Sequence, residues 1–443
     1  MDWNSVDKEA LDLFRSLLRI DTHNPPGRET EACRLLAESL AEDGIESQIF
    51  EKEPGRGNLV AVLEGEAPAG ERLLLSGHLD VVPTEGQDWS CDPFGARVIE
   101  GLLYGRGTLD MKHMVAMSTM VLKLLKRSGK PLSRGLVLAL VADEEVGGGL
   151  GAAYLVEEHP DLVAGRYLLG EVGGLSLHVG GRHVIPVQVA EKGRALLKIR
   201  AQGAAGHGSL PQPDSALVRL AHAIDKLGRA QLPFHPTPAT VDFLAGLADA
   251  AGPVSGRVLR ALSHPVLGPR LLPLTGSRRR LFQAILSNTA TPTMFHAGVA
   301  GNVVPERAEA LVDGRYLPGQ TREALVAEVS AVLGPGYVVE ADVGADPVEV
   351  SPYRTEIYRI IEEQVRRHWP EALVVPSLTP GYTDAKHFSR LGIACYGFTP
   401  VRMPANLSFA ELFHAPDERI PVDGFLWGLR VLHDVAAQYC FAA

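Results

Sequence analysis

The stretch Leu73-Leu74-Leu75-Ser76-Gly77-His78-Leu79-Asp80 decides the fold. Its apolar first half is typical of a buried strand, which then delivers a histidine and a carboxylate. Positions i and i+2 of an extended chain point to the same side. A metal-binding histidine usually has its second ring nitrogen held by a carboxylate. The stretch therefore predicts His78 as a metal ligand and Asp80 as its orienting partner, although a surface loop is the more frequent outcome for so short a motif.

Length and charge limit the functions that this chain can have. A chain of 443 residues is longer than the chains that usually fold around a single hydrophobic core, so its length predicts two domains. The apolar fraction of 46% and charged fraction of 22% are those of an ordinary globular protein. A net charge of −10 argues against a nucleic-acid or anionic-membrane partner. We expect the three consecutive arginines 278–280 to form a solvated face.

Cysteine usage and the N-terminus predict a cytoplasmic protein. The four cysteines are scattered without a Cys-x-x-Cys spacing, which is typical of a reducing compartment and excludes a cysteine-zinc site. The first residues contain neither a basic region nor an apolar signal core. No apolar run approaches the length of a membrane span.

The first part of the chain alternates strand and helix patterns. Helices are predicted over residues 5–18 with Ser5 as N-cap, 30–43 and 112–127. Strands are predicted over residues 45–50, 58–63, 72–77, 135–142 and 166–170. Several of these strands are continuously apolar, which indicates an α/β fold with a mostly parallel sheet and helices on both faces. Such sheets bind ligands beyond the carboxyl ends of their strands.

A second pattern begins near residue 190. An edge-type strand over 195–200, a strand over 308–313 and a helix over 321–333 predict a smaller α+β domain inserted into the larger one. A helix over 353–369 and a strand over 392–398 return the chain to the first domain. We therefore expect a catalytic domain of residues 1–189 and 350–443 and an inserted domain of residues 190–349. The stretch 231–280 predicts only helices of uncertain extent.

Metal-binding side chains follow three of the predicted strands. His78 follows one strand, Asp143-Glu144-Glu145 a second and Glu171 a third, while Asp110 closes a glycine-rich loop before the helix over 112–127. A single carboxylate at a strand end is usually solvated, but four such segments at one rim are hard to assign to chance. Crowded carboxylates repel one another unless cations lie among them.

The types of side chain in this set favour two divalent cations. An imidazole with several carboxylates suits zinc, cobalt or manganese better than calcium, which takes oxygen ligands only. Two cations about 3.5–4 Å apart that share a carboxylate form a recurring hydrolytic unit. One of the neighbours Glu144 and Glu145 can bind metal while the other stays free as general base. Two metals also need a second imidazole, for which the candidates are His207, His387 and His414.

Five motifs in order along the chain carry a family resemblance. They are 76–83 (SGHLDVVP), 105–112 (GRGTLDMK), 143–147 (DEEVG), 206–209 (GHGS) and 414–418 (HAPDE). Together they resemble the M20 family of metallopeptidases and aminoacylases, and they span nearly the whole chain. The resemblance implies a zinc-binding catalytic domain interrupted by a lid domain, which in many members also forms a homodimer.

The resemblance also implies a role for each site residue. His78 and Glu171 would bind one metal, Glu145 and His414 the other, and Asp110 would bridge them. Asp80 would orient His78, Glu144 would be the general base, and His207 would stabilise the oxyanion, often across a dimer. The implied substrate-binding residues are Asn302, Arg315 (for a carboxylate), Gly381 and Thr383, with Asp384 beside them. The chain departs from the family at Lys386-His387, where an arginine and an aromatic residue are commoner, so we expect His387 to be structural.

The resemblance implies a binuclear metal-dependent hydrolase. It would cleave the amide bond of a small peptide or N-acyl amino acid with a free carboxylate, by a metal-bound water with Glu144 as general base. The alternative is a peptide- or amino-acid-binding protein of the same fold that has lost turnover. A phosphate-binding protein is disfavoured, because neither a Gly-x-Gly-x-x-Gly motif nor a Walker loop occurs.

Overall fold

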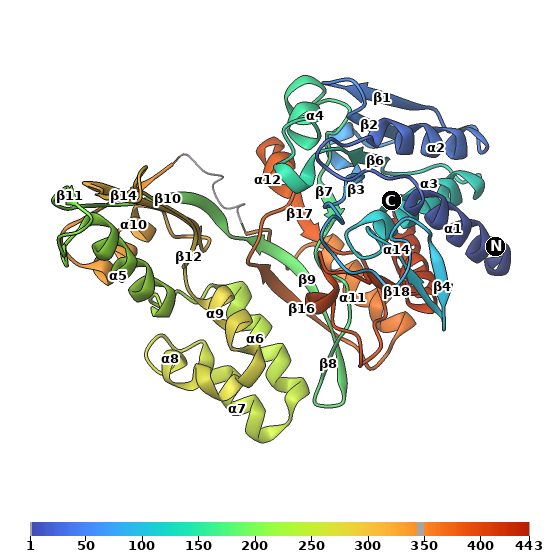
Figure 1. Ribbon diagram of the computed structural model, residues 1–443. Helices are drawn as coiled ribbons and strands as arrows, with labels where there is room; N and C mark the ends of the chain where they lie inside the picture. Colours follow the sequence, from blue (N-terminus) through green and yellow to red (C-terminus); the bar gives the residue numbers. More distant parts are fainter. Residues whose placement is uncertain (1, 343–349, 443) are drawn as a thin grey trace. The chain divides into compact units, whose positions relative to one another are not determined.

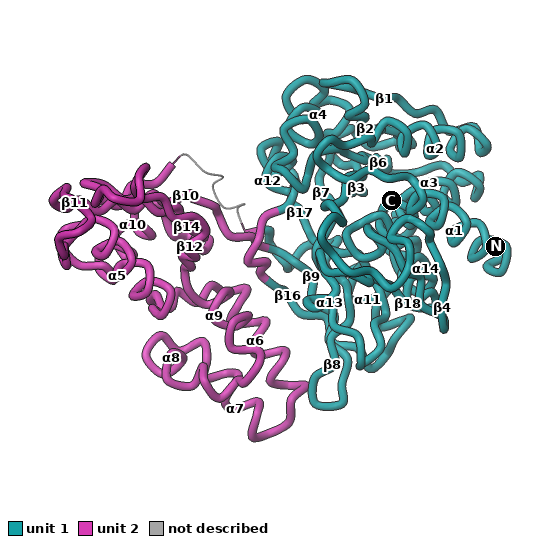
Figure 2. Tube along the Cα trace, in the orientation of Figure 1, with its two compact units in different colours: residues 1–189, 351–377, 383–443 teal, residues 190–350, 378–382 magenta. Residues whose placement is uncertain are grey.

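The computed structural model describes residues 2–342 and 350–442, and these form two compact units (Figure 2). Unit 1 contains residues 1–189, 351–377 and 383–443, and unit 2 contains residues 190–350 and 378–382. The short segment 378–382 thus belongs to unit 2, whereas the sequence analysis placed it in the catalytic domain. Residue 349, where the inserted domain was expected to end, lies outside the described residues.

A large mixed sheet forms the centre of unit 1 (Figure 1). Its order is β1 (Ser47–Glu51), β2 (Gly57–Leu63), β6 (Leu136–Val141), β3 (Leu73–His78), β7 (Tyr167–Gly170), β17 (Ala394–Gly397), β9 (Arg182–Glu191) and β16 (Leu373–Thr379), with β8 (Leu177–Val179) paired to β9. The four central strands β6, β3, β7 and β17 are parallel. The predicted α/β class with a mostly parallel central sheet is confirmed.

Helices cover both faces of this sheet. α1 (Trp3–Leu18), α2 (Glu29–Ala41), α3 (Lys112–Arg127), α11 (Glu356–His368) and α14 (Val422–Phe441) pack on one side. α4 (Ala152–Glu158) and α12 (Ala385–Phe388) pack on the other, against Leu74, Val137 and Ala139. Both faces are covered, so β3 and β6 are buried along their full length. α1 begins two residues before the predicted Ser5 cap, because Asp2 accepts a hydrogen bond from the backbone of Asn4.

A small sheet of unit 1 holds the loop before α3. It is three-stranded, with the order β18 (Arg419–Pro421), β5 (Leu102–Tyr104) and β4 (Arg97–Ile99). β5 directly precedes the glycine-rich loop that ends at Asp110, and β18 directly follows the segment with His414. Pairing of β5 with β18 therefore brings these two segments together, although some 300 residues separate them in the sequence.

Unit 2 is an α+β unit. Its antiparallel sheet has the order β12 (Thr289–Ala297), β14 (Arg307–Tyr316), β10 (Gly193–Gln202) and β15 (Tyr337–Ala341). α5 (Ala216–Arg229) and α10 (Arg322–Leu333) pack on one face of it. The strand predicted over 195–200 is therefore internal rather than an edge strand, since β15 pairs with its outer side. A short ladder joins β11 (Gly206–His207) to β13 (Val303–Val304).

The stretch without a clear sequence pattern forms a helical segment of unit 2. Its elements are α6 (Pro238–Ala251), α7 (Pro253–Leu262), α8 (Gly268–Leu271), the 3₁₀ helix η3 (Leu272–Arg278) and α9 (Arg279–Leu286). Thr237 caps α6 and Pro238 follows at the first helical position, which is a strong helix-start signal. Among the described residues, no helix combines the length and apolar character needed to cross a bilayer.

Candidate metal centre

The sheet brings three predicted ligand segments to one edge. β6, β3 and β7 are parallel neighbours, so their carboxyl ends lie side by side. His78 ends β3, Glu145 follows β6, and Glu171 follows β7. Asp110 lies just before α3, and His414 lies between α13 (Phe409–Leu412) and β18. All five candidate ligands belong to unit 1.

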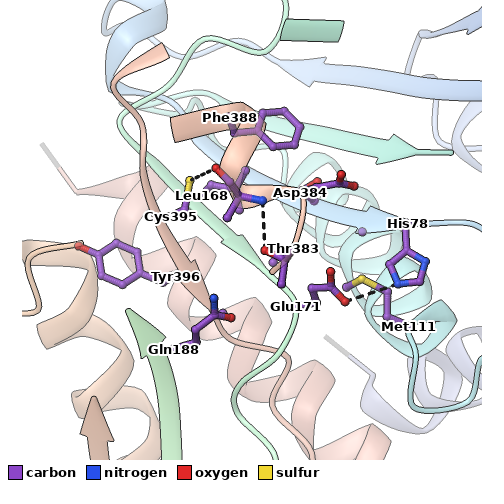
Figure 3. A pocket seen from close by; sticks show the side chains of 15 residues that line it. His78, Met111, Leu168, Glu171, Gln188, Thr383, Asp384, Phe388, Cys395 and Tyr396 are labelled. Carbon is purple, nitrogen blue, oxygen red and sulfur yellow. Dashed lines mark hydrogen bonds and ion pairs between the residues drawn. The ribbon is translucent and has the colours of Figure 1, made fainter. Parts of the chain in front are cut away.

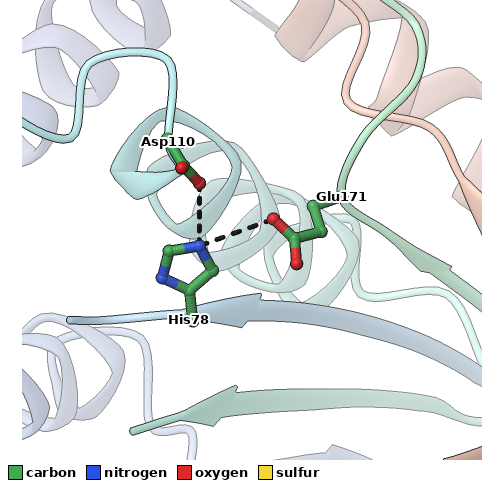
Figure 4. Close-up of side chains that lie close together, drawn as sticks. All are labelled: His78, Asp110 and Glu171. Atoms are coloured by element: carbon green, nitrogen blue, oxygen red, sulfur yellow. Dashed lines mark hydrogen bonds and ion pairs between the residues drawn. The ribbon is translucent and has the colours of Figure 1, made fainter. Parts of the chain in front are cut away.

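One ligand group contains His78, Asp110 and Glu171 (Figure 4). His78 Nε2 lies 2.9 Å from Oδ1 of Asp110 and 3.5 Å from Oε2 of Glu171. The other ring nitrogen, Nδ1, lies 2.9 Å from the backbone carbonyl of Asp80. A carbonyl can only accept a hydrogen bond, so Nδ1 carries a proton, and in the neutral ring Nε2 is the atom with the lone pair that a cation needs.

A second group contains Asp110, Glu145 and His414. His414 Nε2 lies 2.9 Å from Oδ2 of Asp110 and 3.3 Å from Oε2 of Glu145. Asp110 therefore turns one oxygen to each histidine. It is 4% exposed and lies between the two groups, which is the position of a bridging carboxylate.

The donor atoms of both groups fit divalent cations. Within each group, the ligand atoms all lie within 4.8 Å of one another. Oε1 of Glu145 is buried and has no hydrogen-bond partner among the described residues, so one oxygen of this ligand is free for a cation. Two imidazoles and three carboxylates are donors that suit zinc, cobalt or manganese.

The close packing of charges shifts the pKa values of the ligands. Burial favours the neutral imidazoles, but hydrogen bonds with Asp110 and Glu145 outweigh it and raise the pKa of His414 to about 10. Burial also opposes the charged form of His78, but hydrogen bonds with Asp110, Asp80 and Glu171 raise its pKa well above its usual value. Burial, together with the charge of Asp110, raises the pKa of Glu145 to about 7. Without cations, this cluster therefore holds extra protons at neutral pH.

Cation binding is expected to release these protons. A histidine ligand must be neutral, so both imidazoles lose a proton when the centre fills, and the apparent affinity rises with pH. The two imidazole protons alone give a gain of about 100-fold per pH unit between pH 6 and 8, and release of the Glu145 proton makes the dependence steeper below about pH 7. Calorimetric titration of the metal-free protein with zinc, in buffers of different ionisation enthalpy, measures the proton count. Heats that do not depend on the buffer would contradict the raised pKa values.

Glu144 is the carboxylate that neither group uses. Its side chain forms no hydrogen bond or ion pair with a described residue, whereas its backbone is held at both groups: the N–H donates to Oδ1 of Asp80 at 3.1 Å, and the carbonyl accepts from the N–H of Gly147 at 2.9 Å. Burial, reinforced by the charge of Glu171, raises the pKa of Glu144 well above its usual value. A carboxylate with a raised pKa accepts a proton more readily near neutral pH, as a general base must.

The carboxylate of Asp80 faces His78 and also holds the Glu144–Glu145 turn. Its Oδ1 is 3.5 Å from Nδ1 of His78, whereas the Asp80 backbone carbonyl is at 2.9 Å and takes that hydrogen bond. The carboxylate instead accepts from the backbone N–H groups of Glu144 and Glu145, and from Nδ2 of Asn24 at 2.9 Å. Asp80 therefore orients His78 through its main chain and fixes the Glu144–Glu145 turn through its side chain.

Strained backbone supports the same turn. Asp143, which precedes Glu144, has a φ of 73°, a left-handed conformation that is costly for a residue other than glycine. Arg56 donates to Oδ1 of Asp143 at 3.0 Å and is itself held by Glu29. His414 also has a positive φ, of 58°. Such strain persists only where surrounding contacts determine the conformation, and here it occurs in two ligand segments.

Glu418 is a buried residue to which the sequence analysis gave no role. It is 0% exposed and pairs with Arg106 at 2.7 Å. Its Oε1 accepts from the backbone N–H groups of Leu109 and Asp110, at 2.6 and 3.1 Å. Glu418 therefore fixes the loop that presents Asp110. The motif HAPDE contains it, but nothing local in the sequence distinguishes a buried carboxylate from a solvated one.

Glu418→Ala is expected to destabilise unit 1 by about 3–5 kcal/mol, because it leaves Arg106 buried without its partner. Urea unfolding of the metal-free protein, followed by tryptophan fluorescence, reports on this unit alone, since all four tryptophans belong to it. The control is Glu411→Ala, an exposed position on α13. Equal stability of the two variants would show that Glu418 does not hold the loop.

A small cavity is lined by His78, Glu171 and neighbouring residues (Figure 3). Its volume is about 20 Å³, which is room for one water molecule. Thr383 lines it and is 3% exposed, and its hydroxyl accepts from the backbone N–H of Ala385. Thr383 is therefore a buried residue of unit 1 that shares a cavity with the ligands His78 and Glu171. His387 Nε2 lies 3.1 Å from the carbonyl of Gly147 and outside both ligand groups, in keeping with a structural role.

The remaining predicted site residues belong to unit 2, and the structure brings two of them together. His207 and Asn302 are exposed, and the Asn302 carbonyl accepts from the N–H of Gly208 at 2.8 Å. The Ser209 N–H donates to Nδ1 of His207 at 3.2 Å, so the neutral ring carries its proton on Nε2 and can donate from there. Gly381 lies in the short segment 378–382.

Arg315 lies on β14 of the same unit. Its Nε and Nη2 bind the carboxylate of Asp313 at 2.7 and 3.1 Å, and its guanidinium lies 5.0 Å from the ring centre of Tyr382. Nη1 is buried and has no hydrogen-bond partner among the residues that the structure describes. One N–H pair of Arg315 thus stays available for a further acceptor.

Comparison with known proteins assigns the family. The sequence profile of peptidase family M20/M25/M40 matches residues 74–438. The chain is 30% identical to the N-fatty-acyl-amino acid synthase/hydrolase PM20D1.1 of Danio rerio over 378 residues, covering 81% of this chain and 71% of that protein. Two solved structures share the fold. The M20 family metallo-carboxypeptidase Sso-CP2 of Sulfolobus solfataricus has a TM-score of 0.72 at 20% identity and covers 97% and 99% of the two chains.

The second is YXEP of Bacillus subtilis, a dinuclear metal binding peptidase of the M20 family, with a TM-score of 0.62 at 14% identity and 98% of each chain covered. The profile match extends over most of this chain, and the fold is common to all three proteins. The resemblance first seen in five short motifs is therefore confirmed. The chain belongs to peptidase family M20/M25/M40 and is an enzyme of the metallo-hydrolase kind that this family contains.

Proposed function

We propose that the chain hydrolyses the amide bond of a small peptide or N-acyl amino acid with a free carboxylate, with two divalent cations as cofactors. The observation that carries this proposal is the pair of ligand groups that share Asp110, next to an unused Glu144. His78 and Glu171 would hold one cation, Glu145 and His414 the other. When bound, the cations would lower the pKa of a water molecule and polarise the substrate carbonyl. Zinc is the first candidate, with cobalt or manganese as alternatives.

The residues of the chain supply the proton transfers. Glu144 takes a proton from the attacking water and returns it to the leaving amine. His207 Nε2, as a neutral N–H donor, would bind the oxyanion, a contribution of about 3–4 kcal/mol in comparable sites. Asn302 and Gly381 would help to hold the substrate. His207 acts either within one chain or across a homodimer, for which the edge strand β12 offers Met294 and Phe295, 50% and 43% exposed.

The direct test is a substrate screen of the metal-free protein after reconstitution with zinc, cobalt or manganese. The library contains dipeptides and N-acyl amino acids, and release of the free amine is measured. We expect hydrolysis that disappears when the metals are removed and returns when they are restored. A fully loaded protein that binds these compounds without cleaving any of them would overturn the proposal and favour a binding protein of the same fold.

Arg315→Ala is expected to weaken turnover only for substrates with a free carboxylate. Loss of one charge-assisted hydrogen bond of about 1.5–3 kcal/mol lowers kcat/KM about 10- to 150-fold. The measurement compares kcat/KM for each substrate with kcat/KM for its C-terminal amide. For the amides, the variant and the original enzyme should have similar values. Arg307→Ala, an exposed arginine on the same strand, is the control. A similar loss for both acid and amide would show that Arg315 does not bind the carboxylate.

A further inference from the structure

The part of the helical segment that follows α6, residues 252–286, carries an unusual charge. Residues 252–286 contain six arginines and no aspartate, glutamate or lysine, in a chain whose net charge is −10. These arginines are 257, 260, 270, 278, 279 and 280, and all six are exposed. Arg260 pairs with Asp249 of α6. The other five have no ion-pair partner within residues 2–342 and 350–442, so the positive charge of the segment is not neutralised within the described chain.

Large apolar side chains are exposed among these arginines. They are Val254 (75% exposed), Val266 (58%), Leu267 (46%), Leu274 (69%) and Leu281 (48%). Residues three apart on a helix lie on the same side. Val254 and Arg257 on α7 have this spacing, as do Leu267 and Arg270 at α8. Apolar and cationic groups are therefore mixed on the outer surface of the segment.

These exposed groups are not needed for the packing of the segment itself. Its interior is formed by other residues, Leu262, Leu272, Phe282, Ile285 and Leu286, each at most 3% exposed. The end of the segment is fixed by the buried Lys192, which donates to the carbonyls of Ala284 and Ser287, both at 2.9 Å. The exposed side chains of residues 252–286 are thus both cationic and apolar, while the end of the segment is anchored through Lys192 and its core is packed.

We propose that the segment 252–286 docks on a lipid bilayer that contains anionic lipids. Arginines at a helical surface attract anionic headgroups, and short apolar side chains between them enter the boundary of the acyl chains. A nucleic acid would also attract the arginines, but it gives no reason for five large aliphatic groups in water. The whole-chain charge, on which the sequence analysis relied to exclude a membrane partner, hides this local surface. The inference stands apart from the proposed hydrolysis, since it uses no residue of the metal centre.

The test is flotation of the zinc-loaded full chain with phosphatidylcholine vesicles, with and without phosphatidylglycerol. We expect binding only to vesicles with phosphatidylglycerol, weakened at high salt because screening reduces the attraction. Changing Arg278, Arg279 and Arg280 to glutamine should lower the partition coefficient about 100-fold. Leu274→Ser with Leu281→Ser, which leaves the charge unchanged, should lower it about tenfold or more.

The matched control removes three arginines elsewhere. Arg359→Gln, Arg366→Gln and Arg367→Gln lie on exposed positions of α11 in unit 1, where each arginine has an acidic partner. This variant should bind vesicles like the original chain, and all variants should keep their helical circular dichroism and cleave a soluble substrate equally well. Equal binding to neutral vesicles, or no binding at all, would overturn the proposal. A second pattern would also overturn it: the serine variant binds vesicles normally, and the glutamine variant no longer binds either vesicles or duplex DNA. The segment would then bind polyanions in general.

Discussion

Glu144→Ala is expected to lower kcat by about 10²- to 10⁴-fold while the protein still binds two cations per chain. The reason is that the Glu144 side chain forms no hydrogen bond or ion pair with a described ligand and belongs to neither ligand group, yet it follows β6 beside the ligand Glu145. Metal content by mass spectrometry and kcat on the best substrate of the screen measure the two quantities separately.

Glu145→Ala is the matched control, because it removes the neighbouring carboxylate. This variant should lose the cation that His414 helps to hold, and with it the activity. If Glu144→Ala loses cations and Glu145→Ala keeps both, the two glutamates have exchanged roles and the account of the base is wrong.

Asp110→Asn is expected to bind at most one cation and to lose more than about 10³-fold in kcat/KM. An asparagine keeps the shape of the side chain but offers one oxygen, so it cannot serve both groups. Without the second cation, the variant also loses several kcal/mol of charge stabilisation in the transition state. Isothermal titration with zinc gives the stoichiometry. Asp92→Asn, at an exposed position, is the control and should bind two cations.

The fold was predictable because its signals are local. The apolar runs that became β3 and β6 are buried on both faces, and a continuous apolar run is what such strands require. The helical segment from α6 to α9 was not predictable in detail, because glycine and proline interrupt its pattern and several of its apolar residues are exposed. The internal position of β10 depends on pairing with β15, some 140 residues later, which no local pattern reveals.

Four of the five candidate ligands were found because they follow an apolar strand or precede a helix, and a sheet collects such positions at one edge. His414 was found through the need for a second imidazole and through the family resemblance. Their assignment as ligands stays a prediction, supported by the geometry of the two groups. The residues that hold the ligand segments in place were not predicted from the sequence. Glu418, Arg56 and Asn24 act through buried contacts with segments far away in the sequence, at distances that only the folded chain defines. The hold of the Asp80 carboxylate on the Glu144–Glu145 turn was missed for the same reason.

The central claim is that two cations share Asp110 within unit 1. Diffraction from zinc-soaked crystals, with data at the zinc absorption edge, tests it most directly. We predict two anomalous peaks about 3.5–4 Å apart, each about 2.0–2.2 Å from a different oxygen of Asp110. A single peak, or two peaks of which only one contacts Asp110, would contradict the account.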